Sequence, residues 1–437
     1  MATPDLLDSY FRRLEDFSVL RWSGRITKSI GYVVESDGPF CSVGEGCAII
    51  TQDGQVSTGE IVGFRGRTVL SMPLERPNGI RYGDRIVTRG TQPSLRVGPN
   101  VLGRVIDGAG KPIDDKPPYR AREYWPFHGT PPLPLDRIPI QTPLGCGIRA
   151  IDGMLTCGRG QRVGIFGGSG VGKSTLIGMM TRNTSADLTI LALVGERGRE
   201  VREFLEEAIG VEGLARSVLV VSTSDQSPLL RIRAALAATT LAEYFCKQGK
   251  HVLLVVDSLT RFAMAQREIG LAAGEPPTAK GYTPSVFTLL ARLIERAGNF
   301  GSGSITAFYT VLMEGDDQQD VLVDAVRALL DGHVILDRAL NAQGHYPPIS
   351  IRDSLSRLMN SVCSPEHIEK ARRIRKLMAA YAASEDLIRV GAYQKGFDPL
   401  LDRAMAALPS INAFLQQKKN EPAPFDRSVQ GLLSLPE

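Results

Sequence analysis

Residues 167–174 match the pattern G-x-x-x-x-G-K-[ST], in which glycines, a lysine and a hydroxyl are spaced for binding phosphate. An apolar run at 163–166 precedes the pattern, and a helix-like segment at 174–180 follows it. A loop between a strand and a helix can surround phosphate oxygens with main-chain N–H groups, and the helix N-terminus adds a favourable dipole. We expect nucleotide contacts from these residues: Gly167, Gly168, Ser169, Gly170, Val171, Gly172, Lys173, Ser174 and Thr175.

Lys173 and Ser174 have distinct roles in this pattern. The lysine reaches the β- and γ-phosphates, and the serine hydroxyl faces Mg²⁺. The sequence therefore predicts a site for ATP or GTP together with Mg²⁺. The alternative interpretation is a glycine-rich turn that binds no ligand.

Two acidic residues follow apolar runs. One is a candidate for binding the metal and the other for activating the attacking water. Asp257 ends the run 251–256, and α/β sheets bind their ligands at the carboxyl ends of strands. We expect Asp257 to hold the metal shell, although an Asp in this place can also cap a helix. Glu196 follows the run 191–194 and can polarise a water molecule, while Arg197 can meet phosphate. The alternative for Glu196 is an acid favoured by the dipole of a helix N-terminus.

The composition is that of an ordinary globular protein, and the sequence argues against several classes of protein. The chain has 437 residues, 43% of them hydrophobic and 22% charged, and its net charge is +4. We find no Lys/Arg block of the kind that marks nucleic-acid-binding proteins, so we expect no nucleic-acid partner. No apolar stretch has membrane-spanning length, the first residues do not resemble a secretory signal, and the six cysteines form no disulfide or zinc pattern. We expect a cytoplasmic protein.

The first three segments differ in their pattern of apolar residues. Residues 1–19 place Leu and aromatic side chains at helical spacing, which predicts an amphipathic helix that packs on its own domain or binds a partner. Residues 20–95 contain short β-rich runs broken by turn residues, which predict a small β-barrel or sandwich. Nine prolines between 112 and 143 predict an ordered, extended connector that wraps the next domain.

The remaining sequence predicts an α/β domain and a helical domain. Residues 96–360 include the connector and then alternate apolar strands with helical stretches, which indicates a parallel sheet covered on both faces. The expected strands are 163–166, 188–194, 217–221, 251–256 and 305–313. Residues 361–437 are rich in Ala, Leu and charge and predict helices.

Five segments in their order along the chain resemble the rotary-ATPase α/β family. They are the phosphate loop, 195–200 (GERGRE), 257–262 (DSLTRF), 281–285 (GYTPS) and 348–357, which contains PIS and SLSR. The resemblance covers most of the chain. It implies a RecA-like P-loop core with a β-barrel before it and a helical domain after it, and hydrolysis of Mg²⁺-ATP by a homohexameric ring.

Within that family, the chain most resembles the flagellar-type protein export ATPases, which are relatives of type III secretion ATPases. The segments that carry this likeness are 158–162, 275–277, 309–312 and 314–320. The implied function is to drive unfolding and export of flagellar proteins and release of their chaperones. The alternatives are a virulence-type secretion ATPase, a catalytic subunit of a rotary ATP synthase, a nucleotide-binding scaffold without turnover, and a ring helicase or RNA translocase.

The resemblance also implies roles for single residues. Glu196 is the expected catalytic carboxylate, and Arg357 is the expected arginine finger, which reaches the γ-phosphate bound by a neighbouring subunit. Tyr346 is expected to stack on the adenine, with Phe425 as a candidate for a second aromatic in the same pocket. Without the family, Arg357 would be read as a surface residue and Tyr346 as part of a core.

The implied partners lie at the two ends of the chain and inside the ring. They are a stator-like regulator at the N-terminal helix, a coiled-coil stalk protein, an export gate membrane protein, and chaperone–cargo complexes at the C-terminal helices. The implied location is the inner face of the cytoplasmic membrane, where the protein would be peripheral.

Overall fold

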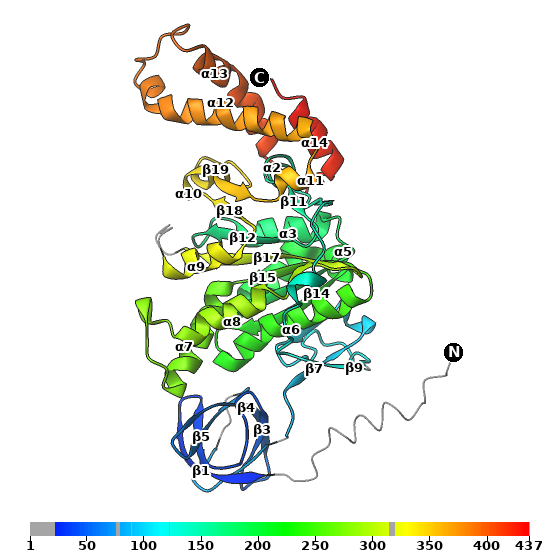
Figure 1. Ribbon diagram of the computed structural model, residues 1–437, viewed down its shortest axis with the longest axis vertical. Coiled ribbons are helices and arrows are strands. Elements are labelled where there is room, and N and C mark those ends of the chain that lie inside the picture. Colours follow the sequence, from blue (N-terminus) through cyan, green and yellow to red (C-terminus); the bar gives the residue numbers. More distant parts are fainter. Residues whose placement is uncertain (1–21, 76–78, 89, 122, 314–319, 437) are drawn as a thin grey trace, which may run out of the picture.

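The computed structural model describes residues 22–75, 79–88, 90–121, 123–313 and 320–436. The helix expected within 1–19 and most of the acidic turn at 314–320 lie outside the described residues. Three parts follow one another along the long axis of the molecule: a β-barrel, a sheet covered by helices, and a C-terminal group of helices (Figure 1). This arrangement confirms the fold class predicted from the sequence.

The first part is a closed barrel whose strands pair in the order β1-β2-β5-β4-β3-β6. Its strands are β1 (Ser23–Ile30), β2 (Val33–Asp37), β3 (Gly46–Ile50), β4 (Val56–Arg65), β5 (Thr68–Pro73) and β6 (Arg85–Thr88). Alternate side chains such as Ile26, Ile49 and Ile86 fill the interior. Closure pairs every strand and leaves no free sheet edge.

The central part is built on a nine-stranded sheet with the order β19-β18-β12-β17-β15-β13-β14-β8, to which β16 adds beside β17. The strands are β8 (Val105–Asp107), β12 (Arg162–Gly167), β13 (Leu188–Glu196), β14 (Ser217–Thr223), β15 (His251–Asp257), β16 (Gly298–Asn299), β17 (Ser304–Leu312), β18 (Gly332–Leu336) and β19 (Ile349–Ser356). All neighbours pair in parallel except β16 with β17 and β18 with β19. The five strands expected from the sequence form the middle of this sheet.

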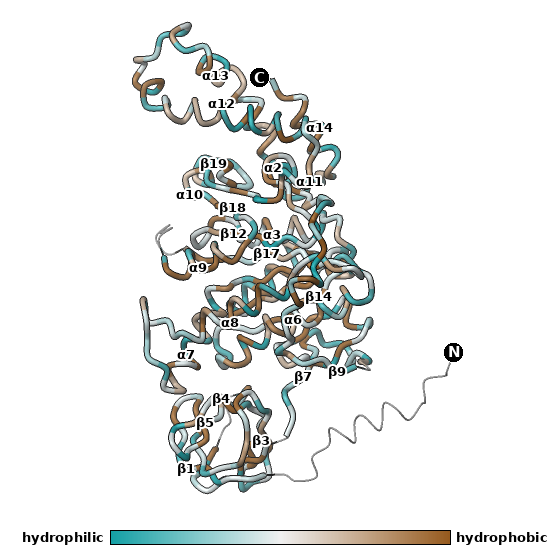
Figure 2. Tube along the Cα trace, viewed as in Figure 1, coloured by the Kyte–Doolittle hydropathy of each residue, from teal (hydrophilic) through white to brown (hydrophobic). Residues whose placement is uncertain are grey.

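Helices cover both faces of the sheet, as the continuous apolar runs predicted. In β13, Ile190 and Ala192 point into one hydrophobic core, whereas Leu191 and Leu193 point into the other. The helices of this part are α2 (Arg149–Met154), α3 (Lys173–Asn183), α4 (Gly198–Glu203), the π-helix η3 (Phe204–Ile209), α5 (Gly210–Ala215), α6 (Pro228–Lys247), α7 (Leu259–Ala273), α8 (Pro284–Ile294), α9 (Val321–Leu329) and α10 (Arg338–Ala342). Figure 2 shows hydrophobic stretches gathered around α6, α8 and β14.

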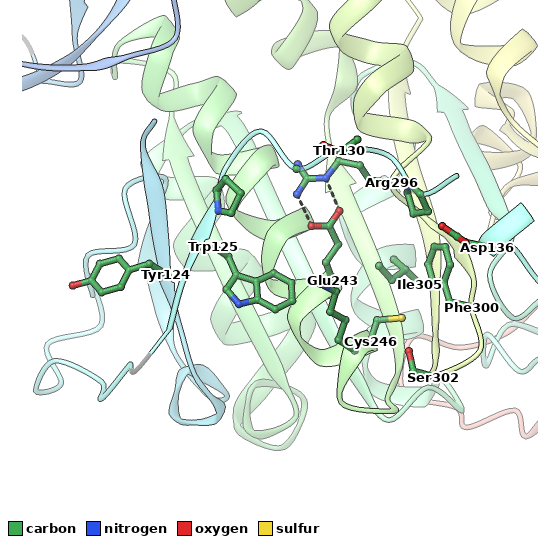
Figure 3. Close-up of a pocket in the computed structure, with 14 residues that line it drawn as sticks. Tyr124, Trp125, Thr130, Asp136, Glu243, Cys246, Arg296, Phe300, Ser302 and Ile305 are labelled. Atoms are coloured by element: carbon green, nitrogen blue, oxygen red, sulfur yellow. Dashed lines mark hydrogen bonds and ion pairs between the residues drawn. The ribbon is translucent and has the colours of Figure 1, made fainter. Parts of the chain in front are cut away.

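The proline-rich connector is extended and packs against the sheet domain. The short elements of the connector and of the chain on either side of it are β7 (Ser94–Val97), η1 (Pro99–Val101), β9 (Glu123–Pro126), η2 (Pro134–Asp136), β10 (Pro143–Leu144) and β11 (Cys157–Gly158). The connector borders a cavity of about 560 Å³ beside α6 and β17 (Figure 3). In its wall, the buried Arg296 makes a two-point ion pair with Glu243 at 2.6 and 2.7 Å and donates to the Phe127 carbonyl. Arg296 thus links the connector to α6, because it bonds to both Phe127 and Glu243.

The last part consists of helices, as predicted. They are α11 (Met359–Val362), α12 (Pro365–Arg389), α13 (Pro399–Leu415) and α14 (Phe425–Leu433). α12 and α13 pack against each other and rejoin the sheet domain through α2 and α14. Among the described residues, the structure contains no helix with the length and apolar character needed to cross a membrane.

Candidate active site

The phosphate loop lies between β12, near the middle of the sheet, and the first turn of α3. Gly170 and Gly172 have φ angles of 79° and 91°, in the left-handed region that glycine adopts readily. A Cβ on Gly172 would also come within 3.0 Å of the Tyr346 ring. Glycine at this position therefore serves both the turn and the close approach of the tyrosine.

A cavity of about 640 Å³ opens at the carboxyl ends of the strands. Its lining residues come from the phosphate loop and from the segments after β13, β14, β15 and β17: Ser169, Gly170, Gly172, Lys173, Ser174, Thr175, Gly195, Glu196, Arg197, Glu200, Ser224, Asp257, Arg261 and Leu312. The structure thus brings Lys173, Ser174, Glu196 and Asp257 into one site. Gly167, Gly168 and Val171 belong to the loop without lining the cavity.

Asp257 is buried at the end of β15 and does not cap the following helix. The hydroxyl of Ser258 accepts the N–H of Arg261 and so caps α7 in its place. Instead, the Asp257 carboxylate accepts a 2.6 Å hydrogen bond from Thr310 of the neighbouring strand β17. Asp257 is therefore available to face a ligand in the cavity, and the helix-cap interpretation does not apply.

Glu196 is the last residue of β13 and lies two residues before α4 begins at Gly198. Burial raises the pKa of Glu196 to about 8, and repulsion from Asp257 and a hydrogen bond to Glu200 add to the effect. Burial lowers the pKa of Lys173, although Asp257 and Glu196 partly oppose this shift. Glu200, in the first turn of α4, fits the helix-dipole interpretation, whereas Glu196 does not.

The residues at the cavity fit Mg²⁺. Magnesium prefers oxygen ligands and is usually bound by one or two protein groups, waters and substrate phosphates. Ser174 and Asp257 supply such oxygens, and the crowding of two carboxylates would be relieved by a divalent cation. The described residues contain no group of three or more His, Cys, Asp or Glu side chains that could hold a metal by itself. A magnesium ion bound jointly by these residues and by the nucleotide phosphates agrees with both observations.

Tyr346 lies beside the end of the phosphate loop. Its hydroxyl donates to the Gly172 carbonyl at 3.5 Å, and burial raises the pKa of Tyr346 to about 12. The segment after Phe414 reaches the same place, because the Gln417 N–H donates to the Tyr346 carbonyl at 2.8 Å.

Phe425, the candidate for a second aromatic, lies at the end of α3 that is far from the phosphate loop. Its Cβ lies about 3.1 Å from the Cβ that Gly145 would carry, next to Ser185 and beyond the far end of α3. α3 has 11 residues and spans about 16 Å. That length separates Phe425 from the phosphate loop.

Arg357 lies at the opposite end of the sheet from the phosphate loop. β19 runs antiparallel to β18, so its last residue, Ser356, pairs with Gly332 at the start of β18. The Arg357 N–H then donates to the Asp331 carbonyl at 3.0 Å. The phosphate loop follows the other end of β12, about 17 Å away along the strand. Arg357 therefore cannot reach the phosphates bound by its own chain.

Comparison with known proteins places this geometry in a family. The model for the ATP synthase alpha/beta family nucleotide-binding domain matches residues 147–356, and the model for its beta-barrel domain matches 26–90. The model for the T3SS EscN ATPase C-terminal domain matches residues 363–434. The flagellum-specific ATP synthase of Bacillus subtilis is 48% identical over 437 residues, which cover 100% of this chain and 99% of that protein. This chain belongs to the ATP synthase α/β family.

Other relatives place this ATPase in the flagellar and type III secretion branch. The flagellum-specific ATP synthase of Pseudomonas aeruginosa is 51% identical over 94% of this chain and 92% of its own length. The assembled ATPase EscN from the type III secretion system of enteropathogenic E. coli superposes with a TM-score of 0.88 at 43% identity, covering 94% of this chain and 98% of EscN. The interpretation of the sequence as a flagellar or type III export ATPase is confirmed.

Sequence reasoning missed three groups in the site of this ATPase. Arg261 lines the cavity from the first turn of α7, and its place in the DSLTRF segment was the available signal. Ser224 lines the cavity after β14 without any motif to mark it. Thr310 touches the site only through Asp257, because the pairing of β15 with β17 brings the two together.

Proposed function

We propose that this ATPase hydrolyses Mg²⁺-ATP at interfaces between copies of the same chain, within a flagellar-type protein export apparatus. The observation that carries the proposal is the position of Arg357 at the opposite end of the sheet from the phosphate loop. One chain holds the phosphate-binding half of a site, and the next chain supplies the arginine. A closed ring of identical chains satisfies every site in this way.

Each residue has a distinct task in the proposed site. The loop amides and Lys173 bind the β- and γ-phosphates, and Ser174 and Asp257 hold the metal shell. When bound, Mg²⁺ neutralises phosphate charge and orients the phosphate oxygens. Glu196 orients the attacking water, and Arg197 contacts phosphate.

Thr310 supports this site through its hydrogen bond to Asp257. Its hydroxyl fixes one oxygen of Asp257, and the register of β15 with β17 fixes the hydroxyl. Such hydrogen bonds hold a metal-binding carboxylate in its working orientation.

Arg357 supplies a positive charge to the site of the neighbouring chain, whose own Arg357 cannot reach the phosphates. As the γ-phosphate separates, negative charge grows on its oxygens, and an arginine finger from the neighbouring chain stabilises that charge. Fingers of this kind contribute about 10³- to 10⁵-fold in rate, or about 4–7 kcal/mol of barrier.

The relatives support the proposed assembly. EscN has been solved as an assembled ATPase and in complex with its central stalk EscO, and that second structure matches this chain with a TM-score of 0.87. We extend this to a homohexamer around a coiled-coil stalk protein, peripheral to the inner face of the cytoplasmic membrane. A stator-like regulator at residues 1–19, an export gate membrane protein, and chaperone–cargo complexes at 361–437 complete the proposed partners. Identifying the proteins that co-purify from cells tests this set and separates flagellar from virulence export.

The Arg357→Ala variant tests the catalytic proposal. Turnover should fall by about 10³-fold or more, while a fluorescent ADP analogue binds with unchanged Kd, because the phosphate loop remains intact. Arg352→Ala is the matched control, since Arg352 is an exposed arginine on β19, the strand that Arg357 directly follows. If Arg357→Ala keeps more than about a tenth of the rate, the arginine finger is assigned wrongly.

A further inference from the structure

The backbone that carries Arg357 is held firmly, although its side chain is exposed. The Arg357 N–H and the Ser356 hydroxyl both bond inward, to the Asp331 carbonyl at 3.0 Å and to the Thr156 carbonyl at 2.8 Å. The Arg357 guanidinium makes no hydrogen bond or ion pair with any of the described residues. The anchoring thus fixes the base of the side chain and leaves its end free.

Gln161 is the buried centre of this anchoring. Its side chain is fully buried, and its amide oxygen accepts the Gly158 N–H at 2.9 Å. Its amide nitrogen donates to the Ser356 hydroxyl at 3.2 Å and to the Asp331 carbonyl at 3.1 Å. Both donors of the amide and one acceptor site are therefore engaged, which is the condition for burying this group without a large penalty.

Asp331 is fixed in turn by the first residue of β12. Its carboxylate accepts the backbone N–H of Arg162 at 3.1 Å and two guanidinium bonds from the same residue at 3.0 and 3.1 Å. Gln161 and Arg162 are consecutive, so one turn of chain holds the segment before β18 and the end of β19 together. That turn leads directly into β12, whose other end is the phosphate loop.

We propose that Gln161 is a positioning residue that aims Arg357 at the neighbouring subunit's nucleotide. This rests on the proposed role of Arg357 as a finger acting between chains. Gln161 touches no substrate; it acts by fixing Ser356 and Asp331, which bracket the arginine. A misplacement of about 1 Å in a catalytic group can cost about 10²-fold in rate. Strand β12 is therefore preceded by Gln161, which supports Arg357 for the neighbouring subunit's site, and followed by the phosphate loop of this chain's own site.

A double-mutant cycle in the full-length protein tests the proposal. Gln161→Leu keeps the side-chain bulk and removes all three hydrogen bonds. We expect kcat to fall about 10²-fold with unchanged Kd for the fluorescent ADP analogue. In an Arg357→Ala background, measured by single-turnover release of labelled phosphate, Gln161→Leu should lower the rate no further.

Two results would overturn the proposal: an equal loss of rate in both backgrounds, or a rise in Kd that matches the loss of kcat. Either would mean that Gln161 only stabilises the fold. If Gln161→Leu does not fold, Ser356→Ala enters the same cycle, with a smaller loss expected. It removes one of the three Gln161 bonds, together with the Ser356 hydrogen bond to the Thr156 carbonyl. Retention of activity by Arg357→Ala alone would instead refute the finger itself, so the two failures are distinguishable.

Discussion

Glu196 and Asp257 are two carboxylates that interact with the half-buried Lys173 in the nucleotide cavity. Burial and repulsion raise the pKa of Glu196 to about 8. In the absence of nucleotide and metal, one proton therefore stays on Glu196 at neutral pH. The folded empty site has a different affinity for protons from that of the unfolded chain, and this difference makes stability depend on pH.

The dependence has a definite sign, and Glu196→Gln tests it. The unfolded chain releases the proton of Glu196 near its ordinary pKa of about 4.3, whereas the folded chain keeps it up to about pH 8. Stability from this group is therefore lost as pH rises between these values. We expect the Tm of Glu196→Gln, relative to that of the unsubstituted protein, to increase from pH 5 to pH 8 in metal-free buffer.

The control for this measurement is Glu206→Gln. Glu206 has an exposed side chain and pairs with Arg202 one turn away on the surface. Its Tm difference should change little over the same pH range. A flat difference for Glu196→Gln as well would mean that burial and the neighbouring carboxylate do not raise the pKa of Glu196 in the folded protein.

Tyr346 offers a second prediction at the residue scale. Its ring lies against Gly172, at the end of the phosphate loop, where the base of a nucleotide is expected. Stacking of a base on an aromatic ring contributes about 1–3 kcal/mol, so Tyr346→Ala should weaken ATP binding by about 5- to 150-fold. Tyr346→Phe keeps the ring and should bind almost normally. Equal losses in both variants would assign the role to the hydroxyl instead.

The residues that the sequence predicted well are those whose placement depends on local chain geometry. Lys173, Glu196 and Asp257 each follow a buried strand at a parallel-sheet end, so three local patterns converge on one cavity without further information. Thr310 and Gln161 could not be recognised in this way. Their contacts with Asp257 and Ser356 depend on which strands are neighbours and in which register.

At the scale of elements, the barrel is joined to the sheet domain by a buried ion pair. Glu60 of β4 and Arg233 of α6 lie 2.7 Å apart, and each side chain is only 8% exposed. Burial alone would raise the pKa of Glu60, but His128 and Arg233 outweigh it and hold that pKa below its usual range. The stabilisation is therefore present above the ordinary pKa of a glutamate and is lost as pH falls.

Breaking this pair from one side should be costly. Glu60→Ala leaves a buried guanidinium without its partner, so we expect the free energy of unfolding to fall by about 3–5 kcal/mol in urea titrations. Replacing both residues, as in Glu60→Leu with Arg233→Met, should restore much of the loss because no charge remains buried. Glu75→Ala, which breaks the exposed pair with Lys111, is the control and should cost much less. A double variant as unstable as Glu60→Ala would contradict this account.

Strands β18 and β19 show where element prediction from the sequence fails. β19 is an edge strand that mixes buried residues with exposed ones such as Arg352, Asp353 and Leu355. Such a segment has neither the continuous apolar run of a central strand nor a clean alternation. Its antiparallel direction is set by the turn around α10, and that direction alone moves Arg357 to the amino ends of the parallel strands.

At the scale of the whole molecule, the fold was predictable because each part has its own apolar period. The barrel has short β-runs, the centre alternates strands with helices, and the end is helical. The placement of the two halves of the active site on opposite ends of one sheet was not visible in any of these periods. It follows from the assembled sheet, and under the proposed role of Arg357 it makes the single chain an incomplete enzyme.

Mixing two inactive variants tests that incompleteness directly. Glu196→Gln chains keep Arg357, and Arg357→Ala chains keep Glu196, so an intact site forms only where the two kinds of chain meet in the correct order. In rings assembled at random from equal amounts, about a quarter of the interfaces meet this condition. Two affinity tags and tandem purification select the mixed rings, and phosphate release measures turnover. We expect activity well above that of either variant alone and up to about a quarter of that of the unsubstituted protein. Mixed rings as inactive as their parents would show that both groups must come from one chain.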